Sequence, residues 1–259
     1  MTAGLPRLEQ PGRNGLGRVL REPALWVIAA LLALAFGMGS LKPFFAAAFP
    51  QLDRPLYEQD GFMALLLAHA WIVALSSSAA AVVGIAAGLA VTRETGREFR
   101  PLVETLVAIG QTVPPVAVLA ISVPLLGFGV MPTLLALFLY GLLPIVRGTI
   151  AGIEAVPVAA REAAVGSGMS AWQTLWHIEL PLAMPGLLAG LRSSVAINIG
   201  TATIAATVGV RTLGSPIIVG LAGFNTAYVL QGALLAGLLA LGVDLCFERA
   251  MRNVRIARP

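Results

Sequence analysis

The chain has 259 residues, of which 58% are hydrophobic and only 12% are charged, whereas a soluble domain carries about a quarter charged residues. A mean hydropathy of +0.86 excludes a water-soluble fold, because so much apolar surface could not be hidden from water. The net charge of +4 does not indicate nucleic-acid binding, since the basic residues form no stripe with interleaved aromatic side chains.

Six apolar segments have the length of a membrane span. A spanning helix needs about 20 mostly apolar residues, and its backbone groups must be hydrogen-bonded within the segment. The segments are residues 24–41, 62–91, 102–126, 130–150, 186–209 and 227–247. They predict an all-α membrane protein with about six transmembrane helices. A transmembrane domain at 24–250 then lies between an N-terminal segment, 1–23, and a C-terminal tail, 251–259. The first apolar segment lacks a clear cleavage site and is expected to stay as an anchor.

The distribution of Arg and Lys predicts the orientation of these spans. If the N-terminus is cytoplasmic, only Lys42, Arg54 and Arg211 lie outside. The inner side then holds fourteen basic residues, which are Arg7, Arg13, Arg18, Arg21, Arg93, Arg97, Arg100, Arg147, Arg161, Arg192, Arg249, Arg252, Arg255 and Arg258. We therefore expect both termini in the cytoplasm.

Polar residues near the middle of two segments mark a candidate route through the membrane. Gln111, Thr112 and Pro114 lie in the third segment, where Pro114 and Pro115 must free backbone carbonyls. Asn198 and Thr201 lie in the fifth, on one helical face with Ala205. Such residues are costly in lipid and tend to face a cavity or another helix. The alternative is close helix packing, the interpretation that we favour for Ser76, Ser77 and Ser78.

The connection at 151–185 is long for a compact membrane protein and therefore suggests a function. A short helix is predicted from Val158 to Val165, ending at Gly166 and Gly168. Ser170 and Gln173 form a capping-box pattern for a second helix, which runs to about Ile178. Pro181 and Pro185 are expected to end that helix.

Two interpretations of this cytoplasmic loop remain open on its residues alone. The small residues Ala163, Ala164 and Gly168 would let a partner approach closely, and Glu162 would offer it a charge. Alternatively, the loop is an amphipathic surface segment with no partner.

The spacing within the loop carries a family resemblance. The loop has Glu162, Ala163 and Ala164, then Gly168, then Ile178, Glu179, Leu180 and Pro181, followed by Pro185. This pattern resembles the EAA loop of permeases of binding-protein-dependent ABC importers. The resemblance implies a MetI-like fold in which Glu162, Ala163, Ala164 and Gly168 dock on a cytoplasmic ATPase dimer. It also implies that Ile178, Leu180 and Pro181 belong to the ATPase-coupling element, and that Leu180, Pro181 and Pro185 join the loop to the fifth span.

Further stretches are similar to the osmoprotectant group of these permeases, which imports glycine betaine, choline and carnitine. They are Gln111 to Pro114, Pro124 to Gly129, Leu137 to Arg147 and Ile197 to Thr203. This resemblance implies a bacterial inner membrane, a second permease subunit, identical or homologous, and an extracytoplasmic solute-binding protein. Arg211 and Thr212, before Leu213 and Gly214, depart from the glycine-rich outer loop of the group.

The sequence contains no ATP site, since its single lysine, Lys42, lies between Leu41 and Pro43 and outside any phosphate-binding loop. We therefore expect no enzyme activity and no cofactor in this chain, with ATP and Mg²⁺ bound by the partner ATPase. His69 and His177 are far apart, without further ligands at metal-binding spacing. Cys246 is the only cysteine.

Two other function classes compete with an ABC importer. An ion-coupled secondary transporter usually has an ionisable or broken-helix site at the membrane midplane, whereas Glu104 and Asp244 lie near the cytoplasmic ends of their segments. A non-transporting membrane scaffold would tolerate changes in the loop.

Overall fold

The computed structural model describes residues 22–256. The predicted N-terminal segment up to Arg21 and the last three residues of the tail lie outside the described residues. Within the described part the regular structure is helical, which confirms the predicted all-α class. In chain order its elements are α2 (Pro23–Gly37), η1 (Met38–Leu41), α3 (Lys42–Ala48), α4 (Phe62–Thr92), η2 (Arg97–Phe99), α5 (Arg100–Thr112), α6 (Pro115–Leu126), α7 (Val130–Glu154), α8 (Val158–Gly166), α9 (Ala171–Thr174), η3 (Leu175–Glu179), α10 (Leu180–Thr201), η4 (Ala202–Val208), α11 (Gly214–Ala222) and α12 (Thr226–Ile256).

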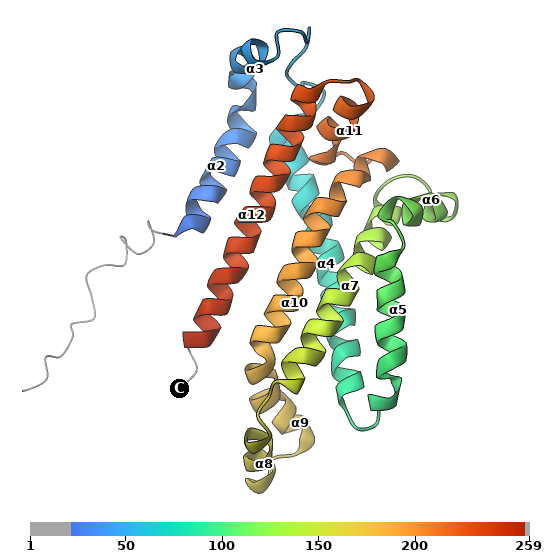
Figure 1. Cartoon of the computed structure of the whole chain (residues 1–259), viewed down its shortest axis with the longest axis vertical. Helices are drawn as coiled ribbons and strands as arrows, with labels where there is room; N and C mark the ends of the chain where they lie inside the picture. Colours follow the sequence, from blue (N-terminus) through green and yellow to red (C-terminus); the bar gives the residue numbers. More distant parts are fainter. Residues whose placement is uncertain (1–21, 257–259) are drawn as a thin grey trace, which may run out of the picture.

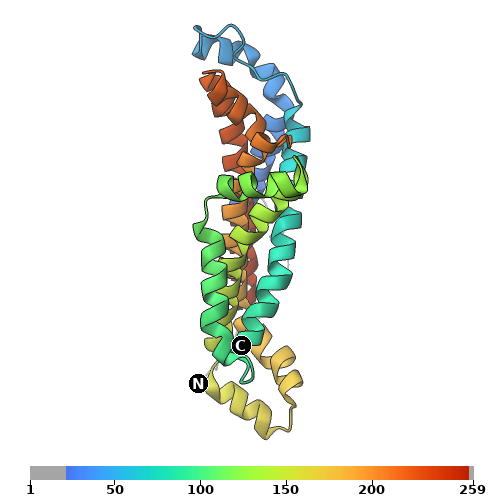
Figure 2. The same ribbon diagram turned by 90° about the vertical axis from the view of Figure 1, so that its right-hand side faces the viewer.

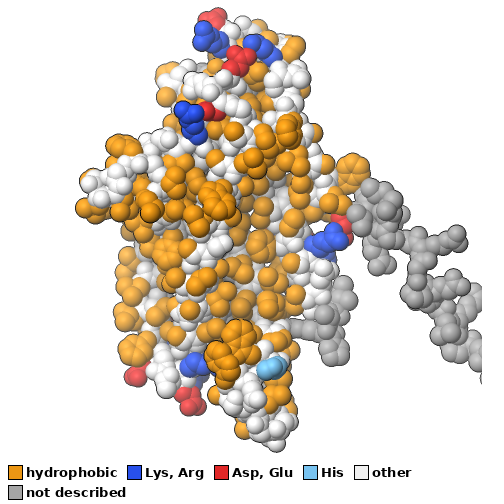
Figure 3. Space-filling view, turned by 180° about the vertical axis from the view of Figure 1, so that it is seen from behind, with side chains coloured by type: hydrophobic (Ala, Val, Ile, Leu, Met, Phe, Trp, Pro, Cys, Tyr) orange, Lys and Arg blue, Asp and Glu red, His pale blue; other side chains and the backbone are white. Residues whose placement is uncertain are grey.

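The long helices run side by side along one axis, with α3 and α11 at one end and α8 and α9 at the other (Figure 1). Among the described residues, five helical segments are long and apolar enough to span a membrane, and the pair α5 and α6 brings the number to six. Apolar side chains cover the middle of the molecule, while many charged side chains gather toward its two ends (Figure 3). This distribution fits a bundle with lipid around its waist.

The third predicted span is not one straight helix. Helices α5 and α6 meet at an angle of 91°, and α6 lies across the bundle in both views (Figures 1 and 2). Val113 is extended because it precedes a proline, and Pro115 starts α6. The hydroxyl of Tyr140 donates a hydrogen bond of 2.7 Å to the carbonyl of Val113, so α7 satisfies a backbone group at the bend.

Helices α7 and α10 pack with their backbones in contact. A Cβ atom on Gly148 would lie 2.7 Å from the Cα of Gly190, and one on Gly186 would lie 2.5 Å from the Cα of Gly152. On α7, Gly148 and Gly152 are four residues apart, and so are Gly186 and Gly190 on α10. This spacing lets membrane helices approach closely. We call these four glycines the glycine seam. No larger residue fits at these positions without moving the two helices apart.

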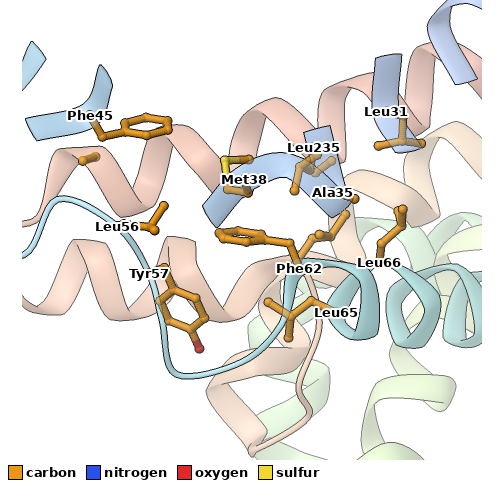
Figure 4. Close-up of a cluster of buried hydrophobic side chains, with 13 residues drawn as sticks. Leu31, Ala35, Met38, Phe45, Leu56, Tyr57, Phe62, Leu65, Leu66 and Leu235 are labelled. Atoms are coloured by element: carbon orange, nitrogen blue, oxygen red, sulfur yellow. The ribbon is translucent and has the colours of Figure 1, made fainter. Parts of the chain in front are cut away.

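A buried apolar cluster joins α2, η1, α3 and the chain before α4 to α12 at the end opposite to α8. Met38, Phe62 and Leu235 lie at its centre (Figure 4). Gln231 of α12 is completely buried; its amide donates to the carbonyl of Pro55 at 2.7 Å and accepts from the backbone N–H of Tyr57 at 3.0 Å. This residue fixes the loop before α4 to the bundle, because a buried amide needs such partners.

The same end carries ionic contacts. Arg211 lies 3.1 Å from Asp60, and the hydroxyl of Tyr57 donates to Asp60 at 2.9 Å. Burial, together with this hydrogen bond, raises the pKa of the Tyr57 phenol, which therefore stays protonated and remains a donor. Arg211, which departs from the glycine-rich pattern, thus holds the loop before α11 to the loop before α4.

Candidate functional site

The segment between α7 and α10 projects beyond the other helices. In both ribbon views α8 and α9 lie at the tip of the molecule, past the ends of α5 and α12 (Figures 1 and 2). The segment contains α8, α9 and η3, the last being one π-helical turn. We call Val158–Glu179 the coupling loop, and many of its side chains are exposed.

Gly168 ends the first helix of the loop through its backbone conformation. Its φ is +78°, a left-handed conformation that residues with a Cβ avoid. The N–H of Met169 donates to the carbonyl of Ala164 at 3.1 Å, and the N–H of Gly168 donates to that of Val165 at 2.9 Å. These two bonds form a Schellman motif, so Gly168 shapes the corner between α8 and α9.

The predicted capping box at the start of α9 is confirmed. The hydroxyl of Ser170 accepts from the N–H of Gln173 at 3.3 Å, and the Gln173 side chain accepts from the N–H of Ser170 at 2.8 Å. Together with the Schellman motif, this box satisfies backbone groups at both sides of the corner. The corner is therefore defined by local hydrogen bonds, before any partner is present.

The predicted docking residues divide between the surface and the interior of the loop. Glu162, Ala163 and Gly168 are exposed. Ala164 is only 4% exposed, so its side chain packs inside the loop; its predicted part in docking stays a prediction. Ile178 and Leu180 are half-buried and Pro181 is exposed.

The coupling loop also exposes large apolar side chains. Val158, Val165, Trp172 and Trp176 are between 52% and 67% exposed, and the two tryptophan rings pack edge to face with centroids 5.4 Å apart. Apolar side chains grouped in this way at a projecting tip are typical of a protein interaction site.

Glu179 anchors the loop from within. Its carboxylate is ion-paired with Arg93, next to the end of α4, at 2.7 Å and with Arg161 of α8 at 2.9 Å. Arg161 also donates to the carbonyl of Ile153 near the end of α7. Only 7% of the Glu179 side chain is exposed. Charges buried to this degree require such partners, so Glu179 fixes α8 against the bundle.

The prolines at the end of the loop do not stop the helix, contrary to the sequence prediction. Residues from Ala171 to Thr201 run without a break through α9, the π turn and α10. Pro181 lies in the first turn of α10, where its missing N–H is tolerated, and Pro185 lies inside that helix. The loop therefore enters the membrane as a continuous helix.

The predicted route residues lie in two different environments. Gln111 is half-buried, and its amide lies 3.4 Å from the carbonyl of Tyr140, while Thr112 and Pro114 are exposed at the bend between α5 and α6. Asn198 is completely buried, and its amide donates to the hydroxyl of Ser77 at 3.0 Å. Thr201 is half-buried at the end of α10. The shared face with Ala205 is lost, because the helix tightens to 3₁₀ geometry from Ala202.

Some charged side chains lie along the long helices. The guanidinium of Arg192 binds both carboxylate oxygens of Asp244 at 2.5 and 2.6 Å, which joins α10 to α12. Arg147 is exposed on α7. Such groups face water or another chain more readily than lipid.

Comparison with known proteins identifies the family. A family model described as the inner membrane component of binding-protein-dependent transport systems matches residues 80–255. The chain belongs to this family. It is the permease subunit of an importer and a multi-pass membrane protein, and the family gives no support to the ion-coupled alternative.

Relatives with curated names extend the comparison. The permease is 40% identical to the osmoprotectant import permease protein OsmY of Salmonella typhimurium over 176 residues, which are 68% of this chain and 75% of the relative. It is 34% identical to OsmW of the same organism over 200 residues, which are 75% of this chain and 92% of that protein. The glycine betaine/carnitine/choline transport system permease protein OpuCB of Bacillus subtilis is 36% identical over 186 residues, 72% of this chain and 85% of OpuCB.

A solved structure supports the predicted MetI-like fold. The permease resembles a chain of the MetNI methionine ABC transporter in an inward-facing conformation, with a TM-score of 0.65 and 21% identity over 76% of this chain and 99% of that chain. At this identity the likeness concerns the fold alone.

Sequence reasoning missed two features of this permease. The glycine seam was detectable, because Gly148 and Gly152, like Gly186 and Gly190, are four residues apart in neighbouring apolar segments. The double ion pair of Glu179 was not, since Arg93 lies 86 residues away along the chain.

Proposed function

We propose that this permease imports quaternary-amine osmoprotectants such as glycine betaine, choline or carnitine. The observation that carries an ATP-driven mechanism is the coupling loop, which has capping motifs on both sides of its corner, projects beyond the bundle (Figure 1) and exposes Glu162 and several large apolar side chains. An ATPase dimer bound to this surface would drive transport, with ATP and Mg²⁺ held by the ATPase. The names of OsmY, OsmW and OpuCB support the substrate class.

We also propose that the loop end faces the cytoplasm, with both termini on that side. Arg93, Arg97, Arg100 and Arg161 line one cleft of about 450 Å³ beside the loop, and an excess of arginine is typical of cytoplasmic ends. Glu22 forms ion pairs with Arg249 and Arg252, so the N-terminal end of α2 and the C-terminal end of α12 lie on the same side of the bundle.

A second permease subunit, identical or homologous, completes the proposed importer together with an extracytoplasmic solute-binding protein. The exposed Arg147 of α7 supports this assembly, because a second chain or a water-filled route would shield it from lipid. Gln111, Thr112, Pro114, Asn198 and Thr201 remain the proposed lining of that route.

The substrate class is tested by reconstituting the complete importer in vesicles loaded with ATP. We expect uptake of radiolabelled glycine betaine, choline or carnitine, and inhibition of that uptake by the unlabelled amines. Uptake driven by an ion gradient without ATP, or failure of all three amines to be taken up or to compete, would contradict the proposal.

The role of the loop is tested with Glu162→Arg. Reversing this charge should lower ATP-driven uptake by more than about tenfold, which corresponds to about 1.4 kcal/mol of lost interaction, while insertion in the membrane stays normal. Glu98→Arg is the matched control, because Glu98 is also exposed near the same end but lies in η2, outside the loop. Equal loss in both variants would reject the coupling loop as the docking site.

A further inference from the structure

Glu179 connects three helices of the permease, one of which is far away along the chain. It ends the π turn and is followed at once by α10. Its carboxylate contacts Arg161 of α8 and Arg93 at the end of α4. Helix α8, the start of α10 and the end of α4 therefore meet at one buried carboxylate.

The surroundings of Glu179 indicate a mechanical role. Arg161 is the residue before Glu162 and also donates to the carbonyl of Ile153 on α7. Without Glu179, α8 could bend relative to the bundle when a partner presses on it, since only the three residues from Ala155 to Pro157 connect α7 to α8. The π turn at Leu175–Glu179 is of a kind often found at functional sites.

We propose that Glu179 is a positioning residue of the coupling loop, which holds α8, the end of α4 and the start of α10 together so that they move as one unit. This inference rests on the proposed docking of an ATPase on α8. Glu179 itself lies beneath the docking surface, so it acts through α8 and is not a contact for the partner.

The test measures the distance between α8 and the end of α4 in the assembled importer. Spin labels replace two exposed residues, Ser167 and Glu94, in a Cys246→Ser background. With Glu179 present we expect one narrow distance distribution that is the same with and without ATP. In Glu179→Gln, which keeps the volume but removes the charge, the distribution should broaden and change when ATP is added.

Glu154→Gln is the matched control. Glu154 lines the same cleft and pairs with Arg100, which belongs to α5 and not to the loop. Its variant should leave the distance distribution narrow. If Glu179→Gln does not assemble, Arg93→Gln breaks only the contact with the end of α4 and should broaden the distribution in the same way.

A second measurement separates this inference from the proposed function. Glu179→Gln should still bind the ATPase but hydrolyse more ATP for each glycine betaine imported, and Glu179→Asp should restore part of the coupling. An unchanged distance distribution in both Glu179→Gln and Arg93→Gln would overturn the positioning role even if Glu162→Arg abolishes uptake. Normal uptake in Glu162→Arg would instead reject the docking site.

Discussion

The glycine seam and the coupling loop are held together in opposite ways. In the seam, α7 and α10 touch through Gly148, Gly152, Gly186 and Gly190, with no room for a side chain between them. In the loop, the helices are fixed by two capping motifs and by ion pairs to Glu179, and large apolar side chains point outward.

This difference suggests how movement of a partner bound to the loop could be transmitted to the membrane helices. Helices packed at backbone distance cannot slide or tilt independently without a clash, so α7 and α10 should respond as a rigid pair. The loop can keep its shape while its apolar side chains are exposed, because local hydrogen bonds define that shape. In the proposed importer, the loop would therefore contact the ATPase and the seam would keep α7 and α10 together.

The largest expected effect comes from filling the seam. Gly186→Ala places a Cβ atom 2.5 Å from the Cα of Gly152, so the two helices must separate, at an expected cost of ~1–3 kcal/mol. The thermal unfolding midpoint of the purified permease should fall. Gly237→Ala is the control, because nothing lies within 4 Å of the added atom, and it should be neutral or slightly stabilising. Equal unfolding midpoints for the two variants would contradict the claim that close packing at the glycine seam stabilises the bundle.

A smaller effect is expected at the loop corner. Gly168→Ala forces a side chain into a left-handed conformation at a φ of +78°, which costs about 1–2 kcal/mol. ATPase binding should weaken while the unfolding midpoint of the bundle changes little. Gly166→Ala, two residues earlier and without a positive φ, should bind normally. If Gly166→Ala weakens ATPase binding as much as Gly168→Ala does, binding does not depend on the backbone geometry of the corner.

Removing the capping box should act in the same direction but less strongly. Ser170→Ala loses the acceptor for the N–H of Gln173, and a lost N-cap costs about 1 kcal/mol. Protease sensitivity of the loop in detergent should increase, and Ser170→Asp should restore protection because aspartate also caps helices. Protection that is unchanged in Ser170→Ala would show that the loop does not depend on this cap.

The smallest effect is expected at Asn198, where it distinguishes packing from a place in the route. Asn198→Ala removes the hydrogen bond to Ser77, and such contacts within membranes contribute about 0.6 kcal/mol on average. If Asn198 serves packing, stability falls slightly while the KM for glycine betaine uptake stays constant. A raised KM with unchanged stability would favour the route.

The sequence predicted what depends on neighbouring residues or on composition. The spans follow from apolar length, and the box at Ser170 and Gln173 follows from local spacing. Contacts between segments that are distant in the sequence could not be predicted from local patterns. Pro114 and Pro115 signalled a disturbed helix, but the 91° bend also depends on Tyr140 of α7, which caps the carbonyl of Val113.

The prolines after the coupling loop show the same limit. Pro181 and Pro185 predicted a helix end, yet both lie within α10. A π turn precedes Pro181, and Gly186 lets α10 lie directly on α7, so tertiary packing overrides the local signal. Ala164 likewise has the small side chain expected of a docking residue, but the fold turns it inward.

The most direct test of the account is site-specific photo-cross-linking at Val165, which is 67% exposed on α8, in membranes that contain the assembled importer. We predict a cross-link to the ATPase subunit, and none from the same probe at Phe44 of α3, which is 63% exposed at the opposite end. A cross-link from Val165 to the solute-binding protein, or to no partner at all, would contradict the account.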